Sequence, residues 1–346
     1  MSNNWINFLE QNGATFNSER EVTFKNTHSS NDLFITDLSW LGTIAVTGND
    51  SKTFLQGQLT NDINNITPSH YQLSGLCTPK GRLKALFSIF SNNENNTLYL
   101  QLPYPLLEET LKRLKMFVMM SKVELSDVSD DLIKIGIYGD KAEQHLKEYG
   151  FTIPEQSGRV SHYNEMQLIR LQDNNTRFEC VGDNEAIQKL WTSLYSHAQC
   201  SNTEQWKLLD IAAGLPNIYS RSKELFIPQM LNLQVLDGIN FKKGCYTGQE
   251  IVARMQYLGK LKRRMYRIQS QSKTLPLVGD KLYSEFIKSG QGTGNIVDAQ
   301  YSASGGIDCL AVISNEAVEK EDVFLDEALQ NKATIVDIPY SVDVKE

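Results

Sequence analysis

The sequence predicts an α+β protein with two ferredoxin-like α/β units followed by a small C-terminal β-barrel. Two successive stretches alternate apolar strand patterns with amphipathic helix patterns in a ferredoxin-like order. The residues after 260 instead show only short strand patterns separated by Gly, Asp and Ser, which is typical of small closed barrels. The length of 346 residues is sufficient for two or three domains.

The first unit is expected within residues 1–130. Its first 28 residues are polar and rich in Asn, which predicts a short helix or arm, so we expect ordered structure to begin near residues 41–48. That stretch reads LGTIAVTG, an apolar run of strand-forming residues. A helix, three strands, a helix and a last strand follow in the sequences NDSKTFLQGQLTNDI, YQLSGLCT, RLKALFSIF, TLYLQL, YPLLEETLKRLKMF and SKVEL.

The second unit is expected within residues 131–200. A strand, a helix, a hairpin and a helix follow each other there in the sequences DLIKIGIYG, DKAEQHLKEYG, MQLIRLQ, TRFECVG and NEAIQKLWTSLYSH. A third region, residues 201–260, begins with the amphipathic pattern TEQWKLLDIAAG. About thirty irregular residues come next, and because many are apolar we expect them to be packed rather than to form a linker. Residues 261–346 form the predicted barrel.

The composition excludes several classes of protein. A net charge of −7 argues against binding nucleic acid over the whole surface. The five cysteines are odd in number and contain no C-x-x-C pair, so we expect neither a disulfide framework nor a metal site. The N-terminus lacks a signal-peptide pattern, and no run reaches the about 18 apolar residues of a membrane span. We therefore expect a cytoplasmic protein that does not contact the membrane.

The motif KKGCYTGQE, at residues 242–250, joins a loop pattern to a helix pattern. Thr247 and Glu250 have the spacing of a capping box, in which a Thr caps a helix whose third residue is Glu. Tyr246 and Ile251 hold the two positions of a hydrophobic staple. The motif thus predicts a helix that begins directly after it.

The predicted helix covers residues 248–258, which places Cys245 just before the helix N-terminus. Helix N-termini carry partial positive charge, and Lys242 and Lys243 add full charges in the sequence nearby. Both effects lower the pKa of a thiol and favour the nucleophilic thiolate. We therefore interpret Cys245 as a functional thiol and Lys243 as its activator.

Two other interpretations of Cys245 remain open from the residues alone. The same loop, with Gly244 and Gly248, could hold a carboxylate or phosphate without using the sulfur. Cys245 could also be a buried structural cysteine in a tight turn. A cysteine hydrolase would need a His base beside the thiol, and no local signature places one of the five histidines there.

Two further features are candidate binding elements. The basic turn, GKLKRR at residues 259–264, is either a solvated connection or a docking patch for phosphate or a polyanionic tail. Trp40 and Trp206 flank apolar segments, and each is either a core residue or a platform on which a flat heterocycle stacks.

The motif residues KGCYTGQEIVAR resemble the signature of the YgfZ family, folate-binding proteins associated with tRNA modification and related to the glycine-cleavage aminomethyltransferase. The blocks GNDSKTFLQGQLTNDI, CTPKGRLKALFSIF, EQWKLLDIAAGLPNI, FIPQMLNLQVLDGINFKKG and the closing PYSV are also similar. The resemblance covers most of residues 33–345. It implies three domains around a central channel that binds tetrahydrofolate or another folate derivative.

The resemblance also implies particular residues and partners. The thiol on which the family depends corresponds to Cys245, and the folate contacts correspond to Trp40, Trp206, Tyr246, Gln249, Glu250 and Arg254. The implied role is cytoplasmic support of tRNA modification and of iron–sulfur enzymes, through indirect or transient contact with tRNA-modifying enzymes. We expect a monomer that does not bind nucleic acid directly.

One departure from the wider superfamily bears on catalysis. Aminomethyltransferases resemble this chain but carry a catalytic Asp in a strand after a Gly turn, where this sequence has Gly81-Arg82-Leu83-Lys84-Ala85. Neither Lys84 nor Ala85 can replace a carboxylate as an acid or base. The sequence therefore favours a folate-binding accessory protein without glycine-cleavage turnover. The alternatives are a folate-dependent one-carbon transferase with another acceptor and a tRNA-binding module that uses the basic turn.

Overall fold

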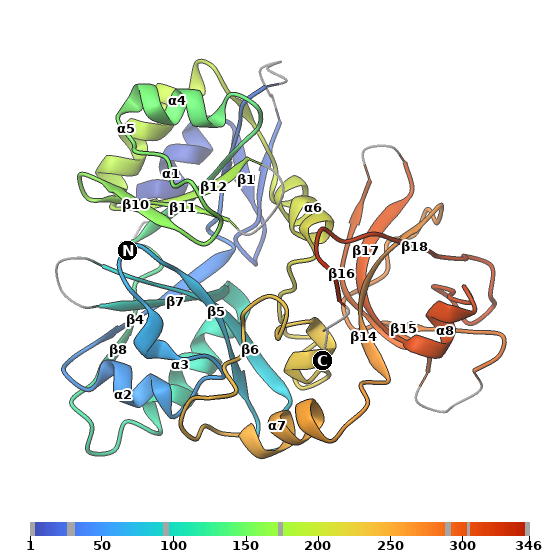
Figure 1. The fold of residues 1–346 in the computed structure, drawn as a ribbon. Helices are drawn as coiled ribbons and strands as arrows, with labels where there is room; N and C mark the ends of the chain where they lie inside the picture. The colour runs from blue at the N-terminus through green and yellow to red at the C-terminus, as the bar shows by residue number, and fades with distance from the viewer. Residues whose placement is uncertain are drawn as a thin grey trace. The chain divides into compact units, whose positions relative to one another are not determined.

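The computed structural model describes residues 4–25, 32–92, 97–171, 176–287, 292–302 and 305–342. The chain divides into two compact units. The first consists of Met1–Ser51, Asn65–Gln72 and Ser88–Trp206. The second consists of Lys52–Asn64, Leu73–Phe87 and Lys207–Glu346. Each unit therefore combines segments that are far apart in the sequence (Figure 1).

A six-stranded sheet of the first unit has the strand order β10-β11-β12-β9-β3-β13. Its strands are β3 (Phe34–Asp37), β9 (Ile133–Tyr138), β10 (Val160–Tyr163), β11 (Met166–Arg170), β12 (Arg177–Gly182) and β13 (Gln199–Cys200). All neighbours are antiparallel except β13 and β3, which are parallel. The strand, helix, hairpin and helix predicted for residues 131–200 are present in that order, and the structure adds strand β10 before the hairpin, which was not predicted.

Three helices cover one face of this sheet: α1 (Asn4–Gln11), α4 (Ala142–Tyr149) and α5 (Asn184–Tyr195) (Figure 1). Strand β9 places Ile133, Ile135 and Ile137 in the core beneath them, because alternate residues of a strand face the same side. Residues of β9 between these isoleucines face the other side of the sheet. That second face is therefore the one on which β9 carries polar groups.

The expectation that ordered structure begins near residue 41 is wrong. Helix α1 is followed by a hairpin of β1 (Ala14–Phe16) and β2 (Val22–Phe24), and Trp5 and Leu9 of the helix are fully buried. Trp5 Nε1 also donates a hydrogen bond of 2.5 Å to Asp37. Trp5 and Leu9 share a core with strand β9 and helix α5, more than a hundred residues further along the chain, so the local polarity of the segment did not show that it is core.

A five-stranded sheet has the order β5-β6-β7-β4-β8. Its strands are β4 (Leu41–Thr47), β5 (Gln72–Cys77), β6 (Leu83–Ser91), β7 (Leu98–Pro103) and β8 (Glu124–Asp127), with helices α2 (Ser51–Gln56) and α3 (Leu107–Lys115) between them in the chain. The predicted order of strands and helices over residues 41–127 is confirmed. Strands β5 and β6 each cross the boundary between the two units.

The C-terminal part of the second unit is an antiparallel half-barrel of order β15-β16-β17-β14-β18. The strands are β14 (Arg263–Ser270), β15 (Lys281–Leu282), β16 (Gly294–Tyr301), β17 (Ile307–Ser314) and β18 (Thr334–Val336). The five strands form a half-barrel sheet whose edge strands are only two and three residues long, so the predicted barrel is confirmed only in part. Single bridges through Phe324 to Tyr283 and Lys332 continue the sheet across the gap.

The irregular segment between α6 (Thr203–Ala213) and α7 (Gln249–Tyr257) is packed, as predicted. It contains a single 3-10 turn, η3 (Pro228–Leu231), yet Phe226, Leu231 and Leu233 are almost fully buried. Within the part of the chain that the structure describes, no helix is long and apolar enough to cross a membrane.

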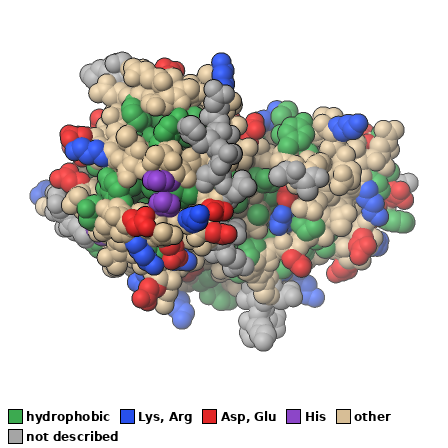
Figure 2. Space-filling model, turned by 90° about the horizontal axis from the view of Figure 1, so that it is seen from above, with side chains coloured by type: hydrophobic (Ala, Val, Ile, Leu, Met, Phe, Trp, Pro, Cys, Tyr) green, Lys and Arg blue, Asp and Glu red, His purple; other side chains and the backbone are tan. Residues whose placement is uncertain are grey.

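Acidic and basic side chains alternate over the face of the molecule drawn in Figure 2. That face shows no continuous basic region, which agrees with the net charge of −7. A general electrostatic grip on nucleic acid needs such a region.

Candidate functional site

The motif loop, residues 242–248, lies in the second unit directly before α7. Helix α7 begins at Gln249 and ends at Tyr257, within one residue of the predicted ends. The predicted capping box is wrong: the N-cap is Gly248, and no side chain caps the helix. The reason is the left-handed conformation of Gly248, with φ of 86°, which starts the helix one residue later than a Thr247 cap would. Ile251 is 37% exposed, and its predicted staple contact with Tyr246 remains a prediction.

The two glycines of the loop have different environments. A Cβ on Gly248 would lie 2.4 Å from the carbonyl oxygen of Thr78 and 3.1 Å from Gly81, in the turn between β5 and β6. A Cβ on Gly244 would meet nothing within 4 Å. Gly248 therefore serves the close packing of two backbone segments, while the space around Gly244 is open.

Lys243 anchors the motif loop to the rest of the second unit. Its side chain is buried, and Nζ donates hydrogen bonds of 2.7 Å to the carbonyl oxygens of Leu59 and Asn61. Nζ also lies 5.2 Å from the centre of the Tyr246 ring. Burial lowers the pKa of Lys243 to about 8, an effect that the nearby charge of Asp62 partly offsets. Its influence on the thiol of Cys245 remains a prediction.

Cys245 is the exposed member of the five cysteines, all of which are free. Burial raises the pKa of Cys77 and Cys200 to about 12 and raises the pKa of Cys180 and Cys309 as well, so those four are inert hydrophobic residues. The interpretation of Cys245 as a buried structural cysteine is therefore wrong. Its thiol is open to a ligand or a partner.

The remaining motif residues divide into buried and exposed groups. Tyr246 is 7% exposed, and its hydroxyl has no hydrogen-bond partner among the described residues. Burial raises the pKa of Tyr246, so the phenol stays protonated. Gln249 Nε2 lies 3.4 Å from the carbonyl oxygens of Lys243 and Gly244, which closes the loop, and Glu250 and Arg254 are exposed.

The two tryptophans expected to contact folate lie in the first unit and are each 2% exposed. The Trp206 ring lies against Gly136 of β9, where an added Cβ would come within 2.3 Å of it. The guanidinium carbon of Arg177 lies over the Trp206 ring, 4.7 Å from the ring centroid. Trp206 is therefore held between a strand and a cation. Trp40 accepts a 2.8 Å hydrogen bond at its carbonyl oxygen from Tyr104 N.

The burial of Lys134, on the second face of β9, was not predicted from the sequence. Lys134 is 2% exposed, and its Nζ donates to Thr43 Oγ1 at 3.1 Å and to the Leu132 carbonyl oxygen at 3.2 Å. Burial lowers its pKa to about 8, against the nearby charges of Glu179 and Asp37, which favour the charged form. The available signal was the lysine inside the apolar strand IKIGIY, since a buried lysine needs partners.

The stretch of residues 81–85, in which the resemblance predicts that a catalytic Asp is missing, presents no carboxylate. Lys84 in β6 forms an ion pair with Glu224, and Ala85 is fully buried. Neither can act as a carboxylate base. Among the described residues, no group of three His, Cys, Asp or Glu side chains could hold a metal ion.

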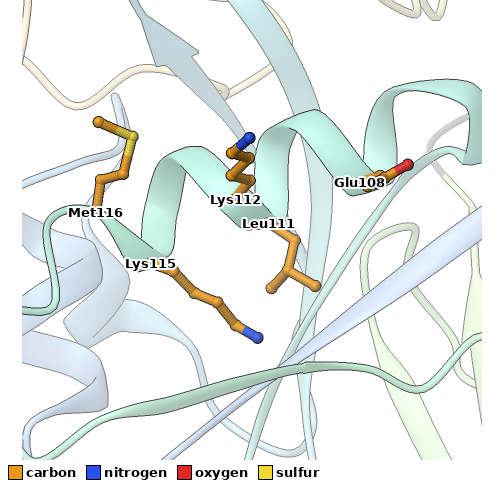
Figure 3. A pocket seen from close by; sticks show the side chains of 5 residues that line it. All are labelled: Glu108, Leu111, Lys112, Lys115 and Met116. Carbon is orange, nitrogen blue, oxygen red and sulfur yellow. The ribbon is translucent and has the colours of Figure 1, made fainter.

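A cavity of about 460 Å³ lies beside α3 in the first unit (Figure 3). Leu111 and Lys115 project to one side of the helix, away from Lys112. The other lining residues are Glu108 and Met116. This lining contains no thiol or hydroxyl nucleophile, so the motif loop remains the candidate site.

Known proteins are similar to this chain over most of its length. The GCVT N-terminal domain family matches residues 17–202. The tRNA-modifying protein YgfZ of Yersinia enterocolitica is 32% identical over 299 residues, 86% of this chain and 90% of that protein. The protein of the same name from Klebsiella pneumoniae is 30% identical over 298 residues, with the same coverage. The glycine cleavage system aminomethyltransferase T from Bartonella henselae has a TM-score of 0.71 at 14% identity, over 95% of this chain and 94% of that one.

The fold is therefore that of the aminomethyltransferase T class, a mixed α/β architecture with several sheets. Within this class, the chain belongs to the YgfZ family. The resemblance inferred from the motif KGCYTGQEIVAR is confirmed.

Proposed function

We propose that this chain is a folate-binding accessory protein that acts in tRNA modification and maintains iron–sulfur enzymes. The observation that carries the proposal is the exposed thiol of Cys245, on a loop that the buried Lys243 fixes in place. The family relatives are named as tRNA-modifying proteins, and the solved relative of the same fold is an aminomethyltransferase. Cytoplasmic localisation and transient contact with iron–sulfur tRNA-modifying enzymes are parts of the same proposal.

The motif and its helix offer a hydrogen-bonding group and a cation of the kinds that a folate would need. The buried Tyr246 hydroxyl has no partner among the described residues and can bond a polar edge of the pterin. The exposed Arg254 can pair with a glutamate carboxylate of the tail. Trp40 and Trp206 are proposed as further contacts, and their burial implies that a ligand meets them at an edge or displaces a neighbour. A bound reduced folate would supply one-carbon chemistry.

The alternative function, one-carbon transfer to another acceptor, has less support. Transfer needs a base or acid near the folate, and the corresponding strand presents Lys84, whose ammonium is paired with Glu224. An accessory role needs only ligand binding and an accessible thiol. The motif loop offers Tyr246 as a candidate ligand contact and Cys245 as the thiol. Formaldehyde release from a methylated glycine in the presence of folate would favour the transferase.

Tetrahydrofolate binding and the thiol can be tested separately. We expect calorimetry to detect tetrahydrofolate binding by the wild-type protein and by Cys245→Ala and Cys245→Ser. In cells we expect both variants to lose the thiolated tRNA modification, because neither alanine nor serine provides a thiolate nucleophile. Thr247→Ala, in the same loop and without a capping role, is the matched control. Absence of binding refutes the folate part, and unchanged tRNA modification refutes the thiol part.

The Tyr246 hydroxyl gives a second prediction about the ligand. Tyr246→Phe should not lower the free energy of unfolding of the ligand-free protein, because the hydroxyl has no partner to lose among the described residues. Tetrahydrofolate affinity should fall about 3- to 10-fold, the value of one neutral hydrogen bond. Urea unfolding and calorimetry measure the two quantities. A loss of stability above about 1 kcal/mol would show that the hydroxyl serves the fold instead.

A further inference from the structure

A larger cavity of about 1230 Å³ lies within the second unit, away from the residues assigned to the motif loop. It is lined on one side by the C-terminal end of α7 and the basic turn, residues 259–264, and on another by α8 (Asn315–Glu319). Its volume suits a ligand larger than a single phosphate. The proposed function assigns nothing to this cavity.

The basic turn offers two uncommitted cations to the cavity. Arg263 donates to the Gly292 carbonyl oxygen at 2.8 Å and Arg264 donates to the Val342 carbonyl oxygen at 2.6 Å, so both guanidinium groups also support the fold. Lys260 and Lys262 are exposed, and neither forms an ion pair with any residue that the structure describes. On a chain with a net charge of −7, this is a local site for an anion.

An aromatic ring lies in the same lining. Tyr257, the last residue of α7, is 68% exposed. Its contact with Phe241 is edge-on, with ring centroids 6.1 Å apart and an interplanar angle of 69°, so the ring is supported while most of it stays open. An exposed ring beside lysines is the combination that stacks a base while phosphates are neutralised.

The cavity lining also contains hydrogen-bond acceptors. Gln229 is 2% exposed, and its Nε2 donates to the Val252 carbonyl oxygen at 2.6 Å. This fixes the amide orientation and leaves Oε1 without a partner among the described residues. Glu316 and Glu319 also line the cavity, although Glu316 is paired with Lys320. Amines of a nucleobase can bond such acceptors.

We propose that this cavity binds a nucleotide, with its phosphate on Lys260 and Lys262 and its base stacked on Tyr257. A tail of several carboxylates fits less well, because it would leave the exposed ring of Tyr257 without a stacking partner. A free nucleotide and a nucleotide within an RNA present the same groups. The inference rests on this cavity and not on folate binding or on the Cys245 thiol.

The test titrates the full chain with ATP by calorimetry and with an unmodified tRNA transcript by fluorescence anisotropy. We expect at least one probe to bind and the double variant Lys260→Gln, Lys262→Gln to bind it at least about tenfold more weakly. Tyr257→Ala should weaken binding about tenfold, while Tyr257→Phe keeps the ring and the affinity. Lys273→Gln, an exposed lysine of the same unit outside the cavity lining, should bind like the wild type.

The two probes separate the two sources. ATP binding alone assigns a free nucleotide, and tRNA binding whose salt dependence is reduced in the lysine variant assigns RNA. Far-UV circular dichroism and thermal melting confirm that each variant is folded. The proposal is overturned if neither probe binds, if folded lysine and tyrosine variants bind like the wild type, or if poly-γ-glutamate occupies the cavity while both nucleotide probes fail.

Discussion

Replacing Gly248 with Ala is expected to lower the free energy of unfolding by about 2–3 kcal/mol. Gly248 has φ of 86°, in the left-handed region that costs an L-residue energy. The added Cβ would also lie 2.4 Å from the carbonyl oxygen of Thr78, a main-chain atom that cannot rotate away. Either the loop or the β5–β6 turn must therefore shift. Urea unfolding followed by circular dichroism measures the loss.

The motif contains its own control for this experiment. Gly244→Ala introduces the same methyl group into open space, where nothing lies within 4 Å. We expect it to change the free energy of unfolding by less than about 0.5 kcal/mol. Equal losses in the two variants would contradict the role assigned to the contact between Gly248 and the turn at Gly81.

Replacing Lys243 with Met is expected to cost about 2 kcal/mol near neutral pH. The thioether has a similar length but cannot donate, so the carbonyl oxygens of Leu59 and Asn61 lose their 2.7 Å hydrogen bonds inside the protein. Lys242→Met, at the exposed neighbouring position, is the control and should stay within about 0.5 kcal/mol of the wild type. A neutral effect of Lys243→Met would show that these carbonyls find water instead.

The pH dependence of the free energy of unfolding should test whether the ammonium of Lys243 is buried. The pKa of Lys243 is lowered from 10.5 to about 8 in the folded protein, so between these values the unfolded chain binds more protons. Stability therefore rises with pH in this window for the wild type, relative to Lys243→Met. Unfolding measured at about pH 7 and about pH 10 should show a larger difference between the two proteins at the higher pH. An unchanged difference would mean that the ammonium is solvated.

The candidate site was predictable where local rules act and not where distant segments meet. The helix after the motif begins and ends within one residue of its predicted limits, because its apolar spacing is a local property. The cap was mispredicted because the conformation of Gly248 is set by the β5–β6 turn, more than 150 residues earlier in the chain. The carbonyl partners of Lys243 come from an equally remote segment, so sequence alone could not show that this lysine is buried.

In the fold, too, the features set by local periodicity were predictable and those set by distant contacts were not. Strand and helix order over residues 41–127 and 131–200 followed from periodicity, as did the C-terminal run of short strands. The short helix expected in the first 28 residues is present as α1, but its burial was not predicted, because it depends on a core shared with strand β9. Lys134 is visible in the sequence as a lysine inside the apolar strand IKIGIY, but its partner Thr43 comes from a segment 91 residues earlier and could not be named from the sequence.

The placement of the N-terminal hairpin has a consequence for biosynthesis. Val22 N bonds Thr203 Oγ1, a partner that follows it by 181 residues. A ribosome adding about 5–20 residues per second needs on the order of ten seconds or more to make that partner. During this time the first strands of the chain are already outside or entering the exit tunnel without their sheet. Until those later residues are made, Trp5 and Leu9 lack part of the core that buries them in the folded protein.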